Sequence, residues 1–371
     1  MDLRPTPEQQ QLVDAFGALY TKESAPERVR GAELLLPPGH DPSLWAHLVE
    51  LGVVAMAVPE EDGGWGASLL DLALIAEQQG RYLASAPIIE AQVAARLLAR
   101  LGVPARDGLV TFALHPARDG VARLVPAGAV ADEAVVLVDD RLLLVSLGSG
   151  SERVSVANLG SLPLADIVVG ASVSVLATGP SALAAHQAAL DDWMVLTANA
   201  LVGIAARGLE IGISYVKERR AFDAPIGSFQ AVSHRLADCA AAVDGARLLA
   251  YEAAWAGSSA GGAGGAGGAG GAGGAGGAGE AGRAGRAGRA AELAAMAFAF
   301  ASETARDATY WSLHFHGGYG FMLEYDIQLY YRRARAWARV WAEPGVALRR
   351  VADCRYGPVA PGSVAPGSVA P

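Results

Sequence analysis

Cysteine is nearly absent from this chain of 371 residues, which contains only Cys239 and Cys354. Both lie in helix-like sequence and imply no disulfide framework, so the composition suits a reducing cytosol. Clustered metal ligands are missing as well, because His314 and His316 stand two positions apart beside a glycine loop without a third ligand nearby. We therefore expect no metal site.

Long apolar runs and an excess of positive charge are also missing. The N-terminus, MDLRPTPEQQQLVDAF, is charged and has no apolar signal core. The longest candidate for a membrane span, around residues 183–213, is interrupted by Asp191, Asp192, Arg207 and Glu210. The net charge is −9 and the pI about 5.3, whereas nucleic-acid binding needs a basic face. The sequence predicts a cytoplasmic protein that binds neither nucleic acid nor a membrane.

Apolar residues are plentiful, at 52% of the chain with a mean hydropathy of +0.27, which is enough for a sizeable core. The pattern predicts an α+β fold in three parts. Residues 1–107 read as an N-terminal helical domain, and residues 108–178 contain short β-branched runs typical of a small β domain. Residues 179–356 return to long helical patterns and predict a C-terminal four-helix bundle.

Local signals mark the ends of individual elements. Ser68 or Asp71 can cap a helix that Gly80 is expected to end. The clearest hairpin is predicted to pair residues 135–138 with residues 141–145 across two aspartates. These signals set the limits of the expected elements but carry no chemistry.

Two segments cannot bury enough apolar surface to order themselves. Residues 257–289 are mainly a Gly-Gly-Ala repeat, which predicts a disordered insertion within the helical bundle. Residues 357–371 are a Pro/Gly repeat and predict a disordered tail.

The stretch 215–238, YVKERRAFDAPIGSFQAVSHRLAD, joins two helical patterns through a break at Pro225. Arg219, Arg220 and His234 gather around this junction. One interpretation is a turn between bundle helices with solvated arginines. The other is an anion site, because helix ends and fixed cations favour bound anions.

Several motifs, in order along nearly the whole chain, resemble the acyl-CoA dehydrogenases, which are flavoproteins with a helix, β-barrel and helix fold. This resemblance implies FAD as cofactor and an acyl-CoA thioester as substrate. It also implies α,β-dehydrogenation with hydride transfer to the flavin, and an electron-transfer flavoprotein as acceptor. The motifs are VPEE at 58–61, GGWG at 63–66, ER at 218–219, PI at 225–226, FQ at 229–230, HGGYGF at 316–321 and EY at 324–325.

The resemblance also assigns a cofactor site that spans two subunits. The segment 219–230 resembles residues that touch the FAD of a neighbouring subunit, and an arginine fork suits a pyrophosphate. The segment 317–320 resembles a loop whose glycines let the adenylate end of FAD approach the backbone across a dimer interface. The cofactor-binding residues implied are Arg219, Phe222, Gln230, Gly317, Gly318 and Gly320.

The catalytic base is the main departure from the family pattern, where a glutamate followed by Gly-Thr comes after an arginine-rich helix. Counting without gaps places Trp341 there, and an insertion of about two residues brings in Glu343, followed by Pro-Gly. A second base position known in the family falls near Trp193, with Asp191 and Asp192 beside it. Glu343 is the candidate base.

Other departures lie on the side that would face the flavin ring. Residues 109–132 lack the family's threonine- or serine-rich turn, and Arg332-Arg333-Ala334 stands where the family has Arg-Asp-Ala. These losses resemble the supporting subunit of actinobacterial α2β2 heterotetramers that act on bulky or steroid-derived acyl-CoAs.

Two hypotheses follow. The first is a catalytic FAD-dependent acyl-CoA dehydrogenase that uses Glu343 as base, and the second is a catalytically silent partner subunit. A third interpretation, a flavin monooxygenase or a relative of nitroalkane oxidase, is compatible with the same fold.

Overall fold

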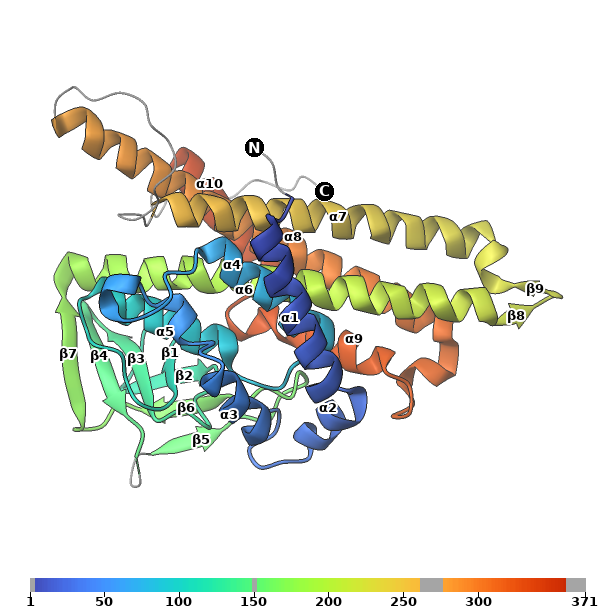
Figure 1. The fold of residues 1–371 in the computed structure, drawn as a ribbon, viewed down its shortest axis with the longest axis horizontal. Helices are drawn as coiled ribbons and strands as arrows, with labels where there is room; N and C mark the ends of the chain where they lie inside the picture. Colours follow the sequence, from blue (N-terminus) through green and yellow to red (C-terminus); the bar gives the residue numbers. More distant parts are fainter. Residues whose placement is uncertain (1–3, 149–151, 261–275, 358–371) are drawn as a thin grey trace, which may run out of the picture.

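The computed structural model describes residues 4–148, 152–260 and 276–357. Its central element is α6 (Gly179–Glu218), a helix of 40 residues whose middle turns are buried on all sides. In Figure 1 the N-terminal helices cross in front of α6, the strands lie beneath one end of it, and α7 and α8 run alongside it. This order of helices, sheets and helices is the α+β architecture that the sequence predicted.

Side-chain caps set the starts of the N-terminal helices. The Thr6 hydroxyl accepts a hydrogen bond from the backbone of Gln9 at 3.3 Å. Ser68 and Asp71 cap each other's backbone at 3.2 and 2.9 Å, which confirms the predicted helix start. The helices of this region are α1 (Pro7–Glu23), α2 (Pro26–Glu33), α3 (Pro42–Glu50), α4 (Leu69–Tyr82) and α5 (Ile88–Arg100), with short 3-10 turns η1 (Ala55–Ala57) and η2 (Glu60–Asp62).

The prediction that Gly80 ends α4 was wrong. The helix continues past Gly80 to Tyr82, and Leu83, whose φ is 52°, is its C-cap. A Cβ on Gly80 would lie 1.8 Å from the carbonyl oxygen of Ala200 in α6, and a Cβ on Gly203 would lie 2.0 Å from that of Glu77. The two glycines therefore allow the backbones of α4 and α6 to touch, a role that the local sequence does not reveal.

The middle region consists of two sheets packed face to face. One sheet has the order β1-β3-β4-β7 with β1 parallel to β3, and the other has the antiparallel order β2-β6-β5. The predicted hairpin is confirmed, because Val138 of β3 pairs with Arg141 of β4 across a tight turn. Apolar side chains of both sheets form one cluster between them. The strands are β1 (Val110–Phe112), β2 (Val121–Val125), β3 (Glu133–Val138), β4 (Arg141–Ser146), β5 (Arg153–Ser155), β6 (Ala165–Val168) and β7 (Val173–Thr178).

The C-terminal half is a bundle in which α6, α7 and α8 pack against one another and α10 packs against α8. Between α6 and α7 a small hairpin of β8 and β9 projects at one tip of the molecule (Figure 1). The elements are β8 (Arg220–Ala221), β9 (Ala224–Pro225), η3 (Ile226–Ser228), α7 (Gln230–Ala260), α8 (Gly276–His316), η4 (Gly317–Phe321), α9 (Ile327–Ala336), η5 (Ala338–Val340) and α10 (Pro344–Tyr356).

Helices enter both ends of the segment 257–289, where the sequence predicted disorder. Helix α7 ends at Ala260 and α8 begins at Gly276. Alanine is the strongest helix former, and it alternates with the glycines and arginines at this edge of the repeat. Residues 261–275, and the predicted tail beyond Gly357, lie outside the described residues.

Helix α6 is long and apolar enough to cross a membrane by composition alone. However, 83% of its most apolar window is buried inside the protein. Helices α4, α5 and α8 cover it, so we interpret α6 as a core helix.

Candidate functional site

A small cavity of about 50 Å³ lies where the N-terminal helices, the sheets and the C-terminal bundle meet. Helices α4, α5, α6 and α9 contribute side chains to its wall, and two loops of the β region close it. The lining includes Gln79, Ser85, Glu90, Ala127, Ser161, Leu162, Trp193, Thr197, Arg333, Trp337 and Val340.

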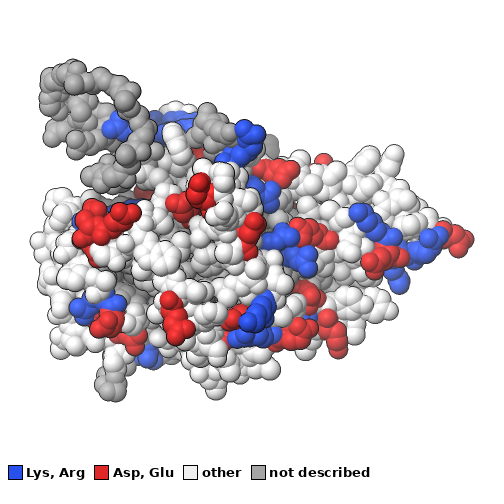
Figure 2. Space-filling view, in the orientation of Figure 1, with Lys and Arg blue, Asp and Glu red and all other residues white. Residues whose placement is uncertain are grey.

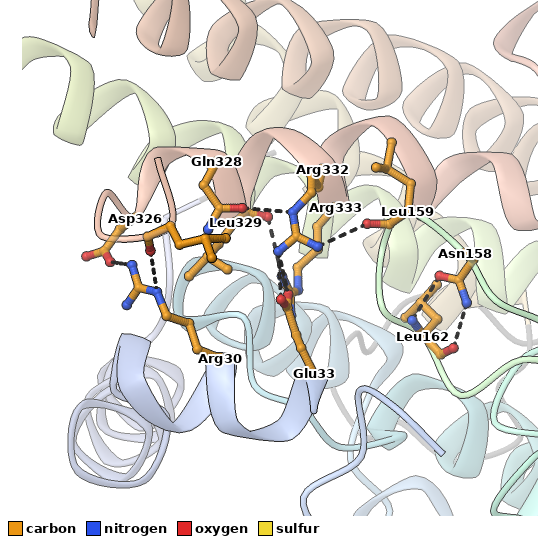
Figure 3. Close-up of polar contacts among 11 residues, drawn as sticks. Arg30, Glu33, Asn158, Leu159, Leu162, Asp326, Gln328, Leu329, Arg332 and Arg333 are labelled. Carbon is orange, nitrogen blue, oxygen red and sulfur yellow. Dashed lines mark hydrogen bonds and ion pairs between the residues drawn. The ribbon is translucent and has the colours of Figure 1, made fainter. Parts of the chain in front are cut away.

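The loop wall of the cavity is organised by Asn158. Its side chain accepts a hydrogen bond from the backbone nitrogen of Leu162 at 2.9 Å and donates to the carbonyl oxygen of the same residue at 2.7 Å (Figure 3). On the opposite wall, the Gln79 amide donates to the Ala86 carbonyl at 3.0 Å. Both walls are therefore held by side chain to backbone bonds.

Arg333 is a buried cation in this cavity wall, compensated by Glu33 of α2. The Arg333 Nη1 atom lies 2.7 Å from Glu33 Oε1, and Arg332 binds both oxygens of Glu33 at 2.8 and 2.7 Å (Figure 3). Burial opposes the charge of Glu33, but Arg333 and Arg332 outweigh it and lower the pKa of Glu33. The arginine that stands in the family's aspartate position is thus matched by an acid about 300 residues earlier in the chain.

Glu90, near the start of α5, is the other charged side chain that lines the cavity. It keeps partial exposure, yet the surrounding protein raises its pKa to about 7 by removing water from the charged form. The described residues include no ion-pair partner for it. Glu90 therefore changes its charge near neutral pH.

Glu343 lies outside the cavity. Its side chain is 64% exposed and forms an ion pair with Arg339 at 2.8 Å, at the start of α10. The structure places this candidate base at the surface and does not bring it together with the lining residues.

Counting from the family motifs leads to Trp341 for one implied base position and to the neighbourhood of Trp193 for the other. The ring of Trp193 lies 5.6 Å from that of Phe298, and the ring of Trp341 lies 5.6 Å from Phe298 on another side. The three rings form one aromatic cluster, and Trp193 also lines the cavity. A carboxylate is therefore absent from both positions.

The two aspartates beside Trp193 are already engaged. Asp192 is buried and binds Arg96 and Arg100 at 2.9 and 2.7 Å. Asp191 forms an ion pair with Arg350, while burial raises the pKa of Asp191 to about 6. Neither carboxylate lines the cavity, so neither replaces the missing base there.

The predicted cofactor residues of the first segment lie on the projecting hairpin and at the start of α7. Arg219 follows the last turn of α6 and is exposed, as is Gln230. Phe222 is 91% exposed, with a φ of 51°, and meets Phe229 edge-on at 6.3 Å. The tip thus presents an exposed arginine and exposed aromatic rings, which are side chains of the kinds that bind phosphates and nucleotide rings.

The second predicted segment follows α8 and lies at the same end of the molecule (Figure 1). The rings of Tyr215 at the end of α6 and His316 at the end of α8 stack at 3.9 Å, which joins the two segments. Gly317 has a φ of 61°, Gly318 faces open space, and a Cβ on Gly320 would lie 2.6 Å from a backbone oxygen. The loop is thus compact, with free backbone on its outer side.

Positive and negative side chains are interspersed on the face shown in Figure 2, including the projecting tip.

A second hollow of about 240 Å³ lies between the η1–η2 segment and α5. It is lined mainly by small apolar side chains, with Asp62 and Arg106 among them. Among the residues described, no three His, Cys, Asp or Glu side chains gather closely enough to hold a metal ion.

Sequence reasoning missed Glu33, Glu90, Gln79 and Trp337. One signal could have found Glu33, because a buried arginine in a usual aspartate position requires a new acid nearby. The other three residues carry no local signal, since only packing brings α4, α5 and α9 around one cavity.

Two family models match the sequence. The N-terminal domain of acyl-CoA dehydrogenases matches residues 6–106, and their C-terminal domain matches residues 184–270. The acyl-CoA dehydrogenase IpdE2 of Mycolicibacterium smegmatis is 30% identical over 349 residues, covering 93% of this chain and 97% of that protein. IpdE2 of Mycobacterium tuberculosis is 27% identical over 94% of this chain and 98% of its own length.

Solved structures share the fold at lower identity. A chain of the ChsE4-ChsE5 complex from Mycobacterium tuberculosis superimposes with a TM-score of 0.80 at 24% identity, covering 97% of this chain and 100% of that one. Butyryl-CoA dehydrogenase from Megasphaera elsdenii gives a TM-score of 0.79 at 19% identity, covering 96% and 100%. A variant of the Tcur3481-Tcur3483 steroid acyl-CoA dehydrogenase gives 0.76 at 24% identity, covering 94% and 97%.

Proposed function

Because this chain belongs to the acyl-CoA dehydrogenase family, we propose that it is the supporting subunit of a heteromeric acyl-CoA dehydrogenase. In this proposal it helps to bind FAD and stabilises the assembly, while a second, related subunit provides the catalytic base.

The observation that carries the proposal is the pair of tryptophans in the two base positions. Removal of the α-proton of a thioester needs a base within hydrogen-bond reach, and the family resemblance implies that this base is a carboxylate. Trp193 and Trp341 have no group that can accept a proton, and their rings pack on Phe298. Glu343, the remaining candidate, is exposed and paired with Arg339.

The size of the cavity beside Trp193 supports the same proposal. Pockets that bind ligands of drug size have volumes of about 300–1,000 Å³, whereas this cavity measures about 50 Å³. A bulky acyl group and a flavin ring do not fit such a space. The chain's own counterpart of an acyl site is therefore filled by its side chains.

FAD would bind through residues of the projecting tip. When bound, FAD would supply the ring that accepts the hydride in the shared site. Arg219 would pair with the pyrophosphate, and Phe222 would stack against a ring. Gln230 and the backbone at Gly317, Gly318 and Gly320 would contact the adenylate end. These roles follow from the exposure of the residues and from the family resemblance.

The partner and substrate follow from the relatives. Similarity to IpdE2 supports an acyl-CoA as substrate, and the likeness to a steroid acyl-CoA dehydrogenase supports a bulky or steroid-derived one. The likeness to a chain of the ChsE4-ChsE5 complex supports a heterotetramer with a second dehydrogenase-like subunit. We propose an electron-transfer flavoprotein as acceptor and a cytoplasmic location.

The test compares the chain purified alone with the chain co-expressed with a dehydrogenase-like gene from its genomic neighbourhood. We expect the chain alone to be colourless and inactive, and the complex to contain FAD and reduce an artificial acceptor with a bulky acyl-CoA. Glu343→Gln should leave that activity unchanged. A chain that is yellow and active alone, and that loses activity in Glu343→Gln, would instead establish it as the catalytic dehydrogenase.

A further inference from the structure

The second hollow, between the η1–η2 segment and α5, is a separate space from the small cavity. Its volume is about 240 Å³, and none of the described residues that line it also lines the small cavity. In another protein, an apolar cavity of about 150 Å³ binds benzene. By that measure the hollow accommodates a ring with a short chain, or about ten non-hydrogen atoms.

The α5 side of the hollow is apolar and made of small side chains. Ala91, Ala95 and Ala99 line it and stand four residues apart on α5. Residues with this spacing share one face of a helix, so methyl groups form the wall where larger side chains would fill the space. Leu98 and Val110 also line the hollow, and both are buried. An occupant therefore meets mainly carbon atoms on this side.

Backbone hydrogen bonds hold the opposite side in shape. The Trp65 nitrogen donates to the Ala55 carbonyl at 3.0 Å. The Gly66 nitrogen donates to the Val58 carbonyl at 2.9 Å. Ala55 and Val58 line the hollow, as does Gly64, where a Cβ would lie 2.1 Å from the Val58 carbonyl oxygen. This wall is preformed, so a ligand does not have to order it on binding.

Asp62 is the unmatched charge at the mouth of the hollow. Among the described residues that line it, only Asp62 and Arg106 are charged, and both are exposed. Two nitrogens of Arg106 each lie 2.8 Å from an oxygen of Glu133, which neutralises this cation. Asp62 has no ion-pair partner within the described part of the chain, and Glu60 and Glu61 beside it in η2 are also acidic. The mouth therefore attracts a positive charge.

We propose that this hollow binds a small apolar amine, in which a ring or a short alkyl body carries one protonated amino group. The body packs against the alanines of α5, and the ammonium group pairs with the Asp62 carboxylate. An acid of the same size finds no free cation, because Arg106 is already engaged by Glu133. The proposal does not depend on whether the chain is catalytic or silent.

Isothermal titration calorimetry of the full-length chain, in the complex that it forms, tests the site with three ligands of one shape. They are 2-phenylethylamine, its neutral counterpart 2-phenylethanol and the anion phenylacetate. We expect the amine to bind with a Kd of about 0.1–1 mM. The alcohol should bind about fivefold more weakly, which is the value of an exposed ion pair. Phenylacetate should give no saturable heat.

Substitutions separate the charge from the apolar wall. Asp62→Asn should weaken binding of the amine about fivefold and leave binding of the alcohol unchanged. Glu61→Gln is the matched control, because Glu61 is an exposed acid in the same turn that does not line the hollow, and it should bind the amine normally. Ala95→Leu places a larger side chain in the hollow and should abolish binding of both ligands.

Three results would overturn the proposal. The first is the absence of saturable heat with 2-phenylethylamine up to about 10 mM. The second is equal binding of phenylacetate and the amine, or an equal effect of Asp62→Asn and Glu61→Gln. The third is unchanged binding in an Ala95→Leu variant that is folded by circular dichroism. Because Asp62 is exposed, its variant tests the site even if Ala95→Leu does not fold.

Discussion

At the scale of single residues, two substitutions against the family pattern shape the site. Arg333 puts a buried cation where an aspartate is usual, and Glu33 and Arg332 complete a charged triad around it. Trp193 is buried near the second base position that the family resemblance implies. The first change puts a charge into the cavity wall, and the second leaves an indole there, which cannot accept a proton.

Glu90 should control how stability depends on pH. Its pKa is about 7 in the folded protein and 4.5 in the unfolded chain, so the folded state binds more protons in this interval. Stability should therefore fall as pH rises from about 4.5 to about 7. In Glu90→Gln the part of this fall that comes from Glu90 disappears, so the variant should gain roughly 2–3 kcal/mol over the parent between pH 5 and pH 8.

Urea unfolding of both proteins at the two pH values measures this gain. Asp191, whose pKa burial raises to about 6, contributes equally to both and cancels in the difference. A constant difference between the proteins at pH 5 and pH 8 would show that Glu90 does not titrate in this range.

At the scale of elements, the crossing of α4 over α6 holds the N-terminal region to the bundle. Gly80 and Gly203 let the two backbones meet. Glu77 of α4 adds an ion pair to Arg247 of α7 at 3.0 Å and accepts from the Tyr251 hydroxyl at 2.6 Å. Close packing and buried polar bonds thus fix the walls from which Gln79 and Trp193 reach the cavity.

Gly203→Ala tests this crossing. The new methyl group would lie 2.0 Å from the Glu77 carbonyl oxygen, so the helices must separate, and we expect a loss of roughly 2–4 kcal/mol in the free energy of unfolding. Gly31→Ala, in α2, meets nothing within 4 Å and should stabilise the protein by about 0.5–1 kcal/mol. Thermal unfolding of the two variants gives both values, and an equal effect of the two would refute the close crossing.

At the scale of the whole molecule, the projecting tip stands apart from the core. The hairpin of β8 and β9 and the loop after α8 expose Phe222, Tyr319 and Phe321 to solvent. A single chain gains nothing from exposing these rings, whereas an assembly buries them. The shape of the monomer therefore agrees with a cofactor site that is completed by a neighbour.

Arg219→Gln and Phe222→Ser should lower the FAD content of the co-expressed complex while leaving the isolated chain as stable as before. Both side chains are exposed, and loss of one charged contact to a phosphate should weaken FAD binding about tenfold. Val154→Ser, an apolar position on β5 that is 67% exposed and lies outside the tip, is the control. Flavin absorbance per complex is the readout, and unchanged flavin content in both variants would remove the tip from the cofactor site.

The sequence by itself determined the architecture, because hydrophobic period, caps and turn residues act locally. Ser68 and the Asp139-Asp140 turn mark elements that the structure confirms. The short motifs that occur in order along the chain also indicated the family. These signals depend only on neighbouring residues, so the sequence alone reveals them.

Only the tertiary structure decided the site. It brought Glu33 to Arg333, joined Trp193 and Trp341 through Phe298, and placed Glu343 at the surface. It also showed that Gly80 serves a helix crossing instead of a helix end. Burial, close approach and charge compensation are properties of pairs of residues far apart in the chain, and no local pattern encodes them.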